Sequence, residues 1–417
     1  MNLLRKLNPG RTTLIFLLIV LAAAVLRLSY PADIEFKYDE HFMFERSQKI
    51  GVTEPWPALG MASGAGTRNP GMSIWIFVGL ARLFSAADPV ALARTIQLLG
   101  VGAVALLLLI AVRSPKEPDR ETWIWTAALA AVNPFAVLFH RKIWAQCALP
   151  LLSTIFLIGW LRRDRLWGAF IWGLVGACLG QIHMSGFYFA GAFFLWTVLF
   201  SRYYKSPLRV HWAGWFLGSV IGAIPLAPWI QYLITSGELP RGLGWSSILT
   251  LSFWRFWVSD PFGLGLSYSL GIRQLYDFFR YPLLGETPTY LVGFAHLVVL
   301  ACCGTLFLRA IRRFFVTRTL HWSGDTALAL SAAMFGFGFL MTLSRVAIMR
   351  HYLIVSFPFE FYWIARMACN DGVRGRKILA ILVGAELILS SFFLYYIHVN
   401  HGAVSGDYWV GYQFQQK

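Results

Sequence analysis

Two adjacent carboxylates, Asp39 and Glu40, are the residues of this chain best suited to proton-transfer chemistry. They lie about ten residues after the first apolar segment, in the string Asp33-Ile-Glu-Phe-Lys-Tyr-Asp-Glu-His41. Neighbouring carboxylates raise the pKa of one of the pair, and a base with a pKa near neutrality is efficient. The pair could supply a general base or hold a divalent cation. The alternative is structural: Asp39 caps a helix that runs to about Ile50, and the negative charge of Glu40 interacts favourably with the dipole of that helix.

The composition defines the surroundings of this pair. The chain has 417 residues, of which 57% are hydrophobic and 13% charged, whereas a soluble domain carries about 25% charged residues. Apolar runs long enough to cross a hydrocarbon core of roughly 30 Å recur from end to end. We therefore expect an all-α polytopic membrane protein in which residues 1–417 form a single integral membrane domain, without a soluble C-terminal domain.

The positions of the spans follow from the hydrophobic runs and the basic loops between them. Basic residues in short loops mark the cytoplasmic side, and here they gather at 5–11, 113–120, 162–165, 202–209, 312–318 and 374–377. This pattern places the N-terminus inside and the tail 398–417 outside. It also explains the net charge of +16 without nucleic acid. The sequence predicts about eleven spans: 12–29, 90–112, 122–140, 147–161, 166–183, 186–201, 212–234, 289–310, 325–343, 350–367 and 377–397.

The two longest loops, 30–89 and 235–288, then fall on the outer side, where function concentrates. The short apolar segment 71–86 fits an interfacial helix better than a span, with Asn69 as its cap and Pro70 in its first turn. Leu251–Val258 is aromatic and amphipathic, which predicts a helix or strand in the headgroup layer. The compactness of the chain favours a bacterial inner membrane, with the active site on the periplasmic side.

Several other side chains could bind substrate or be structural. Arg141 and Lys142 form a basic pair on the outer side, where they could bind a lipid phosphate or snorkel at a helix end. Arg345, Arg350 and His351 form a second outer cluster, before Tyr352, to which the same phosphate argument applies. The remaining candidates are His183, which is more often structural, and Trp245, which could stack on sugar or belong to an aromatic belt.

Two intramembrane carboxylates, Glu360 and Glu386, support a function of another class. Charged groups inside a span are costly and often functional, so the pair would suit a proton-coupled transporter or a lipid flippase. A non-catalytic assembly subunit is a third possibility. The five cysteines all lie in or beside apolar spans, which makes a disulfide framework improbable.

The order of motifs resembles a known family. It comprises the first span, Asp39-Glu40, Asn69-Pro-Gly before an interfacial helix, Asn133-Pro134 to His140-Arg141, and Arg350-His-Tyr352 with Pro358. Together they resemble the GT-C fold membrane glycosyltransferases that use polyprenyl-phosphate sugars, close to protein O-mannosyltransferases and lipid A aminoarabinose transferases. That family often has an acidic residue a few positions after Arg141, where this chain has Gln146.

The resemblance implies a GT-C fold and transfer of a sugar, with inversion, from a polyprenyl-phosphate donor to a lipid, glycan or protein acceptor. Asp39 would be the catalytic base with Glu40 beside it, and these two are the candidate ligands for Mg²⁺ or Mn²⁺. The implied partners are the donor, the acceptor and membrane lipid, with no nucleic acid. The candidate phosphate ligands are Arg141, Lys142, Arg345, Arg350 and His351, and the candidate substrate contacts are Arg68, His183, Tyr352 and Trp245.

Overall fold

The computed structural model is mostly helical and describes residues 9–63, 66–114, 117–207, 209–237, 242–317 and 323–415. Predicted basic residues at Arg5, Lys6, Lys116 and Arg318 lie outside these ranges. The bundle consists of α1 (Pro9–Leu28), α4 (Pro89–Arg113), α5 (Glu117–Val132), α6 (Pro134–Phe139), α7 (Leu149–Leu161), α8 (Leu166–Ile182), α9 (Ser185–Phe200), α10 (Trp212–Ala223), α11 (Ala227–Ser236), α14 (Leu291–Thr317), α15 (Asp325–Ser331), α16 (Phe337–Leu343), α17 (Phe359–Cys369) and α18 (Gly372–Val399).

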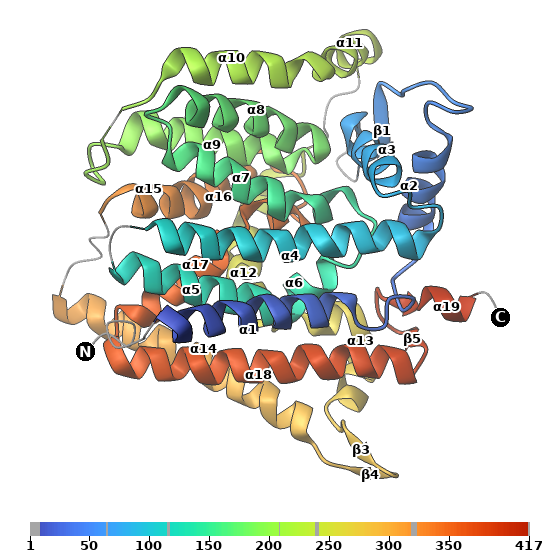
Figure 1. Ribbon diagram of the computed structural model, residues 1–417, viewed down its shortest axis with the longest axis vertical. Helices are drawn as coiled ribbons and strands as arrows, with labels where there is room; N and C mark the ends of the chain where they lie inside the picture. Colours follow the sequence, from blue (N-terminus) through green and yellow to red (C-terminus); the bar gives the residue numbers. More distant parts are fainter. Residues whose placement is uncertain are drawn as a thin grey trace.

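Most of these helices run side by side across the molecule (Figure 1). Among the described residues, six helical segments are long and apolar enough to cross a membrane: Gly10–Leu28, Pro89–Arg113, Trp212–Ser236, Leu291–Arg313, Asp325–Leu343 and Gly372–Val399. A helix satisfies its backbone polar groups internally, which hydrocarbon requires. The chain is therefore an all-α membrane protein by length and composition.

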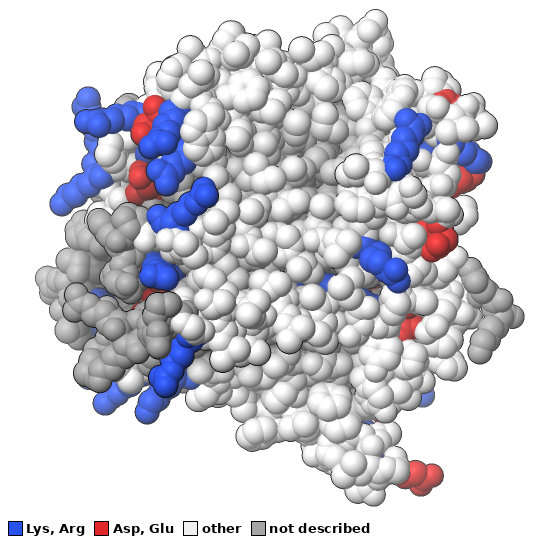
Figure 2. All heavy atoms as spheres, viewed as in Figure 1, with Lys and Arg blue, Asp and Glu red and all other residues white. Residues whose placement is uncertain are grey.

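The charged side chains gather at the two ends of the bundle. Figure 2 shows a broad uncharged band between two charged faces. Lys and Arg dominate the face that carries the N-terminal end of α1, and the opposite face carries α2, α3 and α19 (Figure 1). We call this opposite face the loop face. The uncharged band is what a protein surface in contact with lipid needs.

Three predicted spans are interrupted in addition to 212–234, which the 3₁₀-helix η3 (Ile224–Leu226) divides into α10 and α11. The predicted span 122–140 is divided into α5 and α6 at Asn133, whose side chain accepts from the backbone of Ala136 and caps α6. The predicted span 350–367 begins as a 3₁₀-helix, η7 (Arg350–Ser356), before α17 starts after Pro358. The third, 325–343, contains a π-helical turn, η6 (Ala332–Gly336). Proline and asparagine explain the first two interruptions, since neither continues a helix well.

The first long loop supplies α2 (Tyr38–Lys49), the strand pair β1 (Leu59–Ala62) and β2 (Arg68–Pro70), and α3 (Met72–Leu83). The helix predicted to run from Asp39 to about Ile50 is confirmed, because α2 ends at Lys49. The predicted helix start at Asn69 and Pro70 is wrong, because both residues lie in β2 and α3 begins after Gly71. Asn69 donates to the carbonyl of Met61 instead, so its side chain holds the strand pair rather than a helix end.

The second long loop and the tail complete the loop face. The loop contains the 3₁₀-helix η4 (Trp245–Thr250), α12 (Ser252–Ser259), η5 (Asp260–Phe262), α13 (Leu266–Phe278) and the hairpin β3 (Leu283–Leu284) and β4 (Thr287–Pro288). The segment Leu251–Val258 is thus helical. The tail forms β5 (Gly402–Ala403), β6 (Trp409–Val410) and α19 (Tyr412–Gln415) and folds back onto the first loop, where Glu35 pairs with Gly411.

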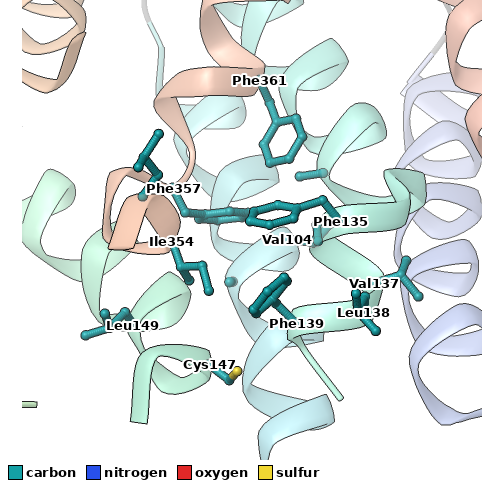
Figure 3. Packing of buried hydrophobic residues seen from close by; sticks show 14 of the residues in the cluster. Val104, Phe135, Val137, Leu138, Phe139, Cys147, Leu149, Ile354, Phe357 and Phe361 are labelled. Atoms are coloured by element: carbon teal, nitrogen blue, oxygen red, sulfur yellow. The ribbon is translucent and has the colours of Figure 1, made fainter. Parts of the chain in front are cut away.

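A buried aromatic cluster connects the loop face to the bundle. Phe135 and Phe139 of α6 lie near Ile354 and Phe357 around η7, with Val104 of α4 close by (Figure 3). The 3₁₀-helix η2 (Ala145–Ala148) closes this cluster below α6. The loop between α6 and η2, which carries Arg141 and Lys142, is therefore held against a rigid interior.

Candidate active site

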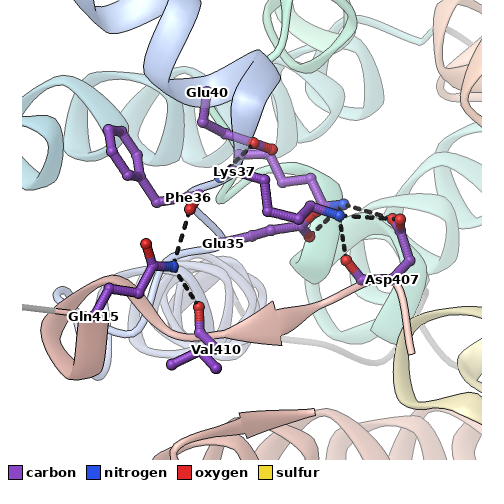
Figure 4. Close-up of polar contacts among 8 residues, drawn as sticks. Glu35, Phe36, Lys37, Glu40, Asp407, Val410 and Gln415 are labelled. Atoms are coloured by element: carbon purple, nitrogen blue, oxygen red, sulfur yellow. Dashed lines mark hydrogen bonds and ion pairs between the residues drawn. The ribbon is translucent and has the colours of Figure 1, made fainter. Parts of the chain in front are cut away.

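The start of α2 separates the roles of the two adjacent carboxylates. Glu40 turns back to accept a hydrogen bond from the Lys37 backbone N–H, 3.0 Å away, and so closes a capping box (Figure 4). The interpretation of Asp39 as the cap is wrong, because Glu40 caps the helix and Asp39 is its second residue. Within the described ranges, no hydrogen bond or ion pair engages the half-buried Asp39 carboxylate. Asp39 is the carboxylate left available for chemistry.

Beside Asp39 lies a ring of four alternating charges, formed by Lys37, Glu35, Lys142 and Asp407, which we call the charge ring. The Glu35 carboxylate contacts the Lys37 ammonium at 2.7 Å and the Lys142 ammonium at 2.5 Å. The Asp407 carboxylate contacts the same two ammonium groups at 3.0 and 3.6 Å. Figure 4 shows Lys37 between Glu35 and Asp407. Three distant segments of the chain thus meet next to Asp39.

The electrostatics of the site follow from this arrangement. Partial burial raises the pKa of Asp39, and the negative charge of Asp407 adds to the effect, while the two lysines oppose it. For Lys142, burial works to lower the pKa, but Glu35, Glu40 and Asp407 outweigh it and raise the pKa overall. The site therefore holds a permanently charged lysine beside a carboxylate with a strengthened affinity for protons.

Glu40 gives a testable pH dependence. Burial and the charge of Glu35 raise its pKa to about 7, above the ordinary value of 4.5. Folding favours the protonated form of Glu40. The contribution of Glu40 to the free energy of unfolding is therefore fully present below its ordinary pKa and is lost as the pH rises through 7. Glu40→Gln keeps the capping oxygen and removes the charge. At pH 8 we expect Glu40→Gln to melt at a higher Tm than wild type, because its free energy of unfolding is higher by up to about 3 kcal/mol. This difference in stability should shrink as the pH falls toward 5.

This prediction is measured by thermal unfolding in detergent across pH 5–8. Glu286→Gln is the matched control, because Glu286 is an exposed acid between β3 and β4 and its removal should leave the pH dependence of Tm unchanged. A gap between Glu40→Gln and wild type that is equal at pH 5 and pH 8 would contradict the assignment.

Arg141 lies in the scaffold of the site. Its guanidinium is buried and donates to four backbone carbonyls at and after the end of α1, those of Leu26, Arg27, Ser29 and Tyr30. These carbonyls lack partners within the helix, and a cation at a helix C-terminus also complements its dipole. The structure therefore places Arg141 as the cap that fixes the first loop, rather than as a residue open to a phosphate.

A chain of aromatic contacts leads from the charge ring to a small cavity. The Lys142 ammonium lies 4.3 Å from the centre of the Trp144 ring, and the Trp144 and His351 ring centres are 5.3 Å apart. His351 in turn lies beside His183 and Tyr352. His183 and Tyr352 line a cavity of about 40 Å³. The predicted residues Lys142, His351, His183 and Tyr352 are thus joined, through Trp144, by one chain of contacts.

The other predicted residues make contacts with groups other than Asp39 and the charge ring. Arg350 is buried, with its guanidinium 2.8 Å from the Asp260 carboxylate and 2.6 Å from the carbonyl of Gly265. The Arg345 guanidinium stacks on Trp245 at 4.5 Å. The Arg68 side chain is exposed, while its carbonyl accepts from Trp229. Arg350 is thus already neutralised, and Arg345, Trp245 and Arg68 remain candidates for outer contacts with substrate.

The described side chains do not form a complete metal cage of their own. Across the part of the chain that the structure describes, no group of three or more His, Cys, Asp or Glu side chains converges. Glu40, one of the two candidate ligands, uses one oxygen to cap α2. We therefore derive no step through Mg²⁺ or Mn²⁺.

Three members of the charge ring were not among the predicted site residues. Glu35 and Lys37 belong to the same polar string as Asp39, so their alternation with apolar residues was a usable signal. Asp407 is a single acidic residue in the tail, 370 positions after Lys37. Nothing in the local sequence marks it, because its role depends on the tail folding back. Comparison of the chain with protein-family models and with curated proteins gives no match.

Proposed function

We propose that this protein is a GT-C-like membrane glycosyltransferase that moves a sugar from a polyprenyl-phosphate carrier to an acceptor at the loop face. The observation that carries the proposal is the Asp39 carboxylate, which has no partner in the described ranges while the acids and lysines of the charge ring beside it are paired. The resemblance of the motif order to the GT-C family supplies the class of reaction.

In the proposed mechanism, Asp39 takes the proton of the acceptor hydroxyl as its oxygen attacks the anomeric carbon. The bond between that carbon and the phosphate oxygen breaks on the opposite side, so the configuration inverts, and polyprenyl phosphate leaves. Lys37 and Lys142 are the cations nearest to Asp39 and would neutralise the charge that develops on the leaving phosphate. Preorganised charges of this kind commonly contribute the largest share of catalysis.

The membrane arrangement is part of the proposal. We place about eleven crossings, by adding to the six long helices the shorter apolar segments Ala145–Leu161, Leu166–Ile182 and Ser185–Phe200 and the paired elements α5–α6 and η7–α17. The basic face would be cytoplasmic and the loop face periplasmic, in a bacterial inner membrane. The acceptor, which is a lipid, glycan or protein, would then meet the donor at the outer surface.

The rival function is a proton-coupled transporter or lipid flippase, which the buried glutamates favour. Glu386 of α18 accepts a hydrogen bond from Asn133 at 3.0 Å, and Glu360 of α17 accepts one from Ser356 at 3.3 Å. Both carboxylates thus bridge elements of the bundle. These contacts give each glutamate a structural role as a hydrogen-bond acceptor, so neither requires transport to explain it.

The test is release of polyprenyl phosphate from a panel of radiolabelled polyprenyl-phosphate sugars by the purified protein in detergent, with lipid, glycan and protein acceptor fractions supplied. We expect release from one donor, and largely retained release in Glu360→Gln and Glu386→Gln. Release that depends on both glutamates would favour the transporter class. No release from any donor would overturn the transferase and favour a transporter or an assembly subunit.

A further inference from the structure

The charge ring has a closed edge and an open edge. On the closed edge, the side chains of Glu35 and Lys142 are only 1% and 3% exposed. On the open edge, those of Lys37 and Asp407 are 28% and 29% exposed. The closed edge is fixed by burial, because separating Glu35 from Lys142 would leave two buried charges unpaired. Any exchange of partners in the ring must therefore take place at the open edge.

Asp407 is the member of the ring that can leave it most easily. The backbone around it is held independently of its carboxylate: the Asp407 N–H donates to the Tyr268 carbonyl at 3.1 Å, and the Tyr408 N–H donates to the Ser269 carbonyl at 3.0 Å. The Asp407 carbonyl also accepts a hydrogen bond from the Lys37 ammonium. Gly406 passes so close to α13 that a Cβ atom there would lie 2.1 Å from the Ser269 carbonyl oxygen. These backbone contacts hold the tail against α13. The Asp407 carboxylate can therefore rotate away from the lysines while the tail remains bound to α13.

The chemistry of the open edge matches a phosphate group. The Asp407 carboxylate carries one negative charge and presents its two oxygens to the two ammonium groups. A phosphodiester also carries one negative charge and two terminal oxygens. Replacing one by the other conserves the charge balance of the ring, and Glu35 would keep both lysines in position. The replacement would also bring the phosphate next to Asp39.

We propose that Asp407 is an internal anion that occupies the phosphate position between Lys37 and Lys142, and that the lipid-linked donor displaces it on binding. This inference rests on the proposed function for the identity of the donor. It makes Asp407 a competitor of the ligand: the carboxylate keeps the lysines paired while the site is empty, and every binding event must break its two ion pairs. Affinity for the phosphate is thereby set below what the lysines alone would give.

The test measures the Kd of farnesyl methyl phosphate, a phosphodiester with one negative charge, by isothermal titration calorimetry in detergent, for wild type and Asp407→Asn. Asparagine keeps the size of the side chain and leaves the backbone contacts intact. Removing the competition of these two ion pairs, in which the Asp407 carboxylate is partly exposed, predicts about tenfold tighter binding. Farnesol, which lacks the phosphate, should bind wild type and Asp407→Asn equally. Glu286→Gln removes one acid from an exposed loop tip and should leave the Kd of farnesyl methyl phosphate unchanged.

Equal or weaker binding by Asp407→Asn would overturn the proposal, as would equal tightening in Glu286→Gln. Asp407→Ala must change the Kd in the same direction, which protects the result against a local effect of the asparagine amide. Failure of this inference is distinguishable from failure of the proposed function. Sugar transfer by wild type without tighter binding by Asp407→Asn would contradict only the displacement of Asp407. Tighter binding by Asp407→Asn without sugar transfer from any donor would support a lipid-phosphate site and contradict the transferase function.

Discussion

Asp39→Asn is expected to lower kcat for sugar transfer about a thousandfold while changing the Kd of the donor less than about threefold. Asparagine fills the same space and keeps the same polarity, but it does not accept a proton from the acceptor hydroxyl. The half-buried carboxylate has no partner in the described ranges, so its removal should leave the fold intact. The loss should therefore appear in turnover, and single-turnover release together with a donor-binding titration measures the two quantities separately.

The matched control for Asp39→Asn is Glu40→Gln, one residue away. Glu40 faces back to the Lys37 backbone and caps α2, a role that glutamine preserves. We expect Glu40→Gln to retain kcat within about tenfold of wild type. An Asp39→Asn enzyme with near-normal turnover would exclude Asp39 as the base. If Glu40→Gln lost as much activity as Asp39→Asn, the base would instead be the pair acting together.

The catalytic candidate was visible in the sequence because it depends on local pattern. Asp39 lies shortly after an apolar span and at the start of a short amphipathic helix. Its position near the membrane surface and the helix that carries it can therefore both be predicted from neighbouring residues. Hydrophobic runs likewise predicted the helical bundle, since burial in lipid constrains composition strongly. The interruptions at Asn133 and Pro358 were missed because a run remains apolar across a break in the helix.

The charged surroundings of Asp39 could not be predicted in the same way. Lys142 pairs with Glu35 across more than a hundred residues, and Asp407 reaches the ring only because the tail folds back onto the first loop. Arg141 and Lys142 are adjacent in sequence and look equivalent. The turn between α6 and η2 sends Arg141 to the end of α1 and Lys142 to the charge ring. Long-range contacts of this kind leave no local signal.

The difference between Arg141 and Lys142 leads to the second large effect. Arg141→Lys conserves the charge but not the forked geometry with which the guanidinium reaches carbonyls from Leu26 to Tyr30. A lysine ammonium is a compact point charge that cannot span them. Buried carbonyls left without a donor cost about 1–3 kcal/mol each, and those of the buried residues Leu26 and Arg27 are the ones exposed to this cost. We therefore expect Arg141→Lys to lose about 3 kcal/mol of stability, seen as a lower Tm in detergent.

The same variant separates a scaffold role from phosphate binding. Because Arg141 faces backbone carbonyls, the folded fraction of Arg141→Lys should bind the polyprenyl-phosphate donor with a Kd within about twofold of wild type. Arg273→Lys is the control, since Arg273 is exposed on α13, and its Tm should not change. An unchanged Tm together with a weaker donor Kd in Arg141→Lys would mean that the guanidinium meets the phosphate after all. The donor site would then include both the charge ring and the residues around the C-terminal end of α1.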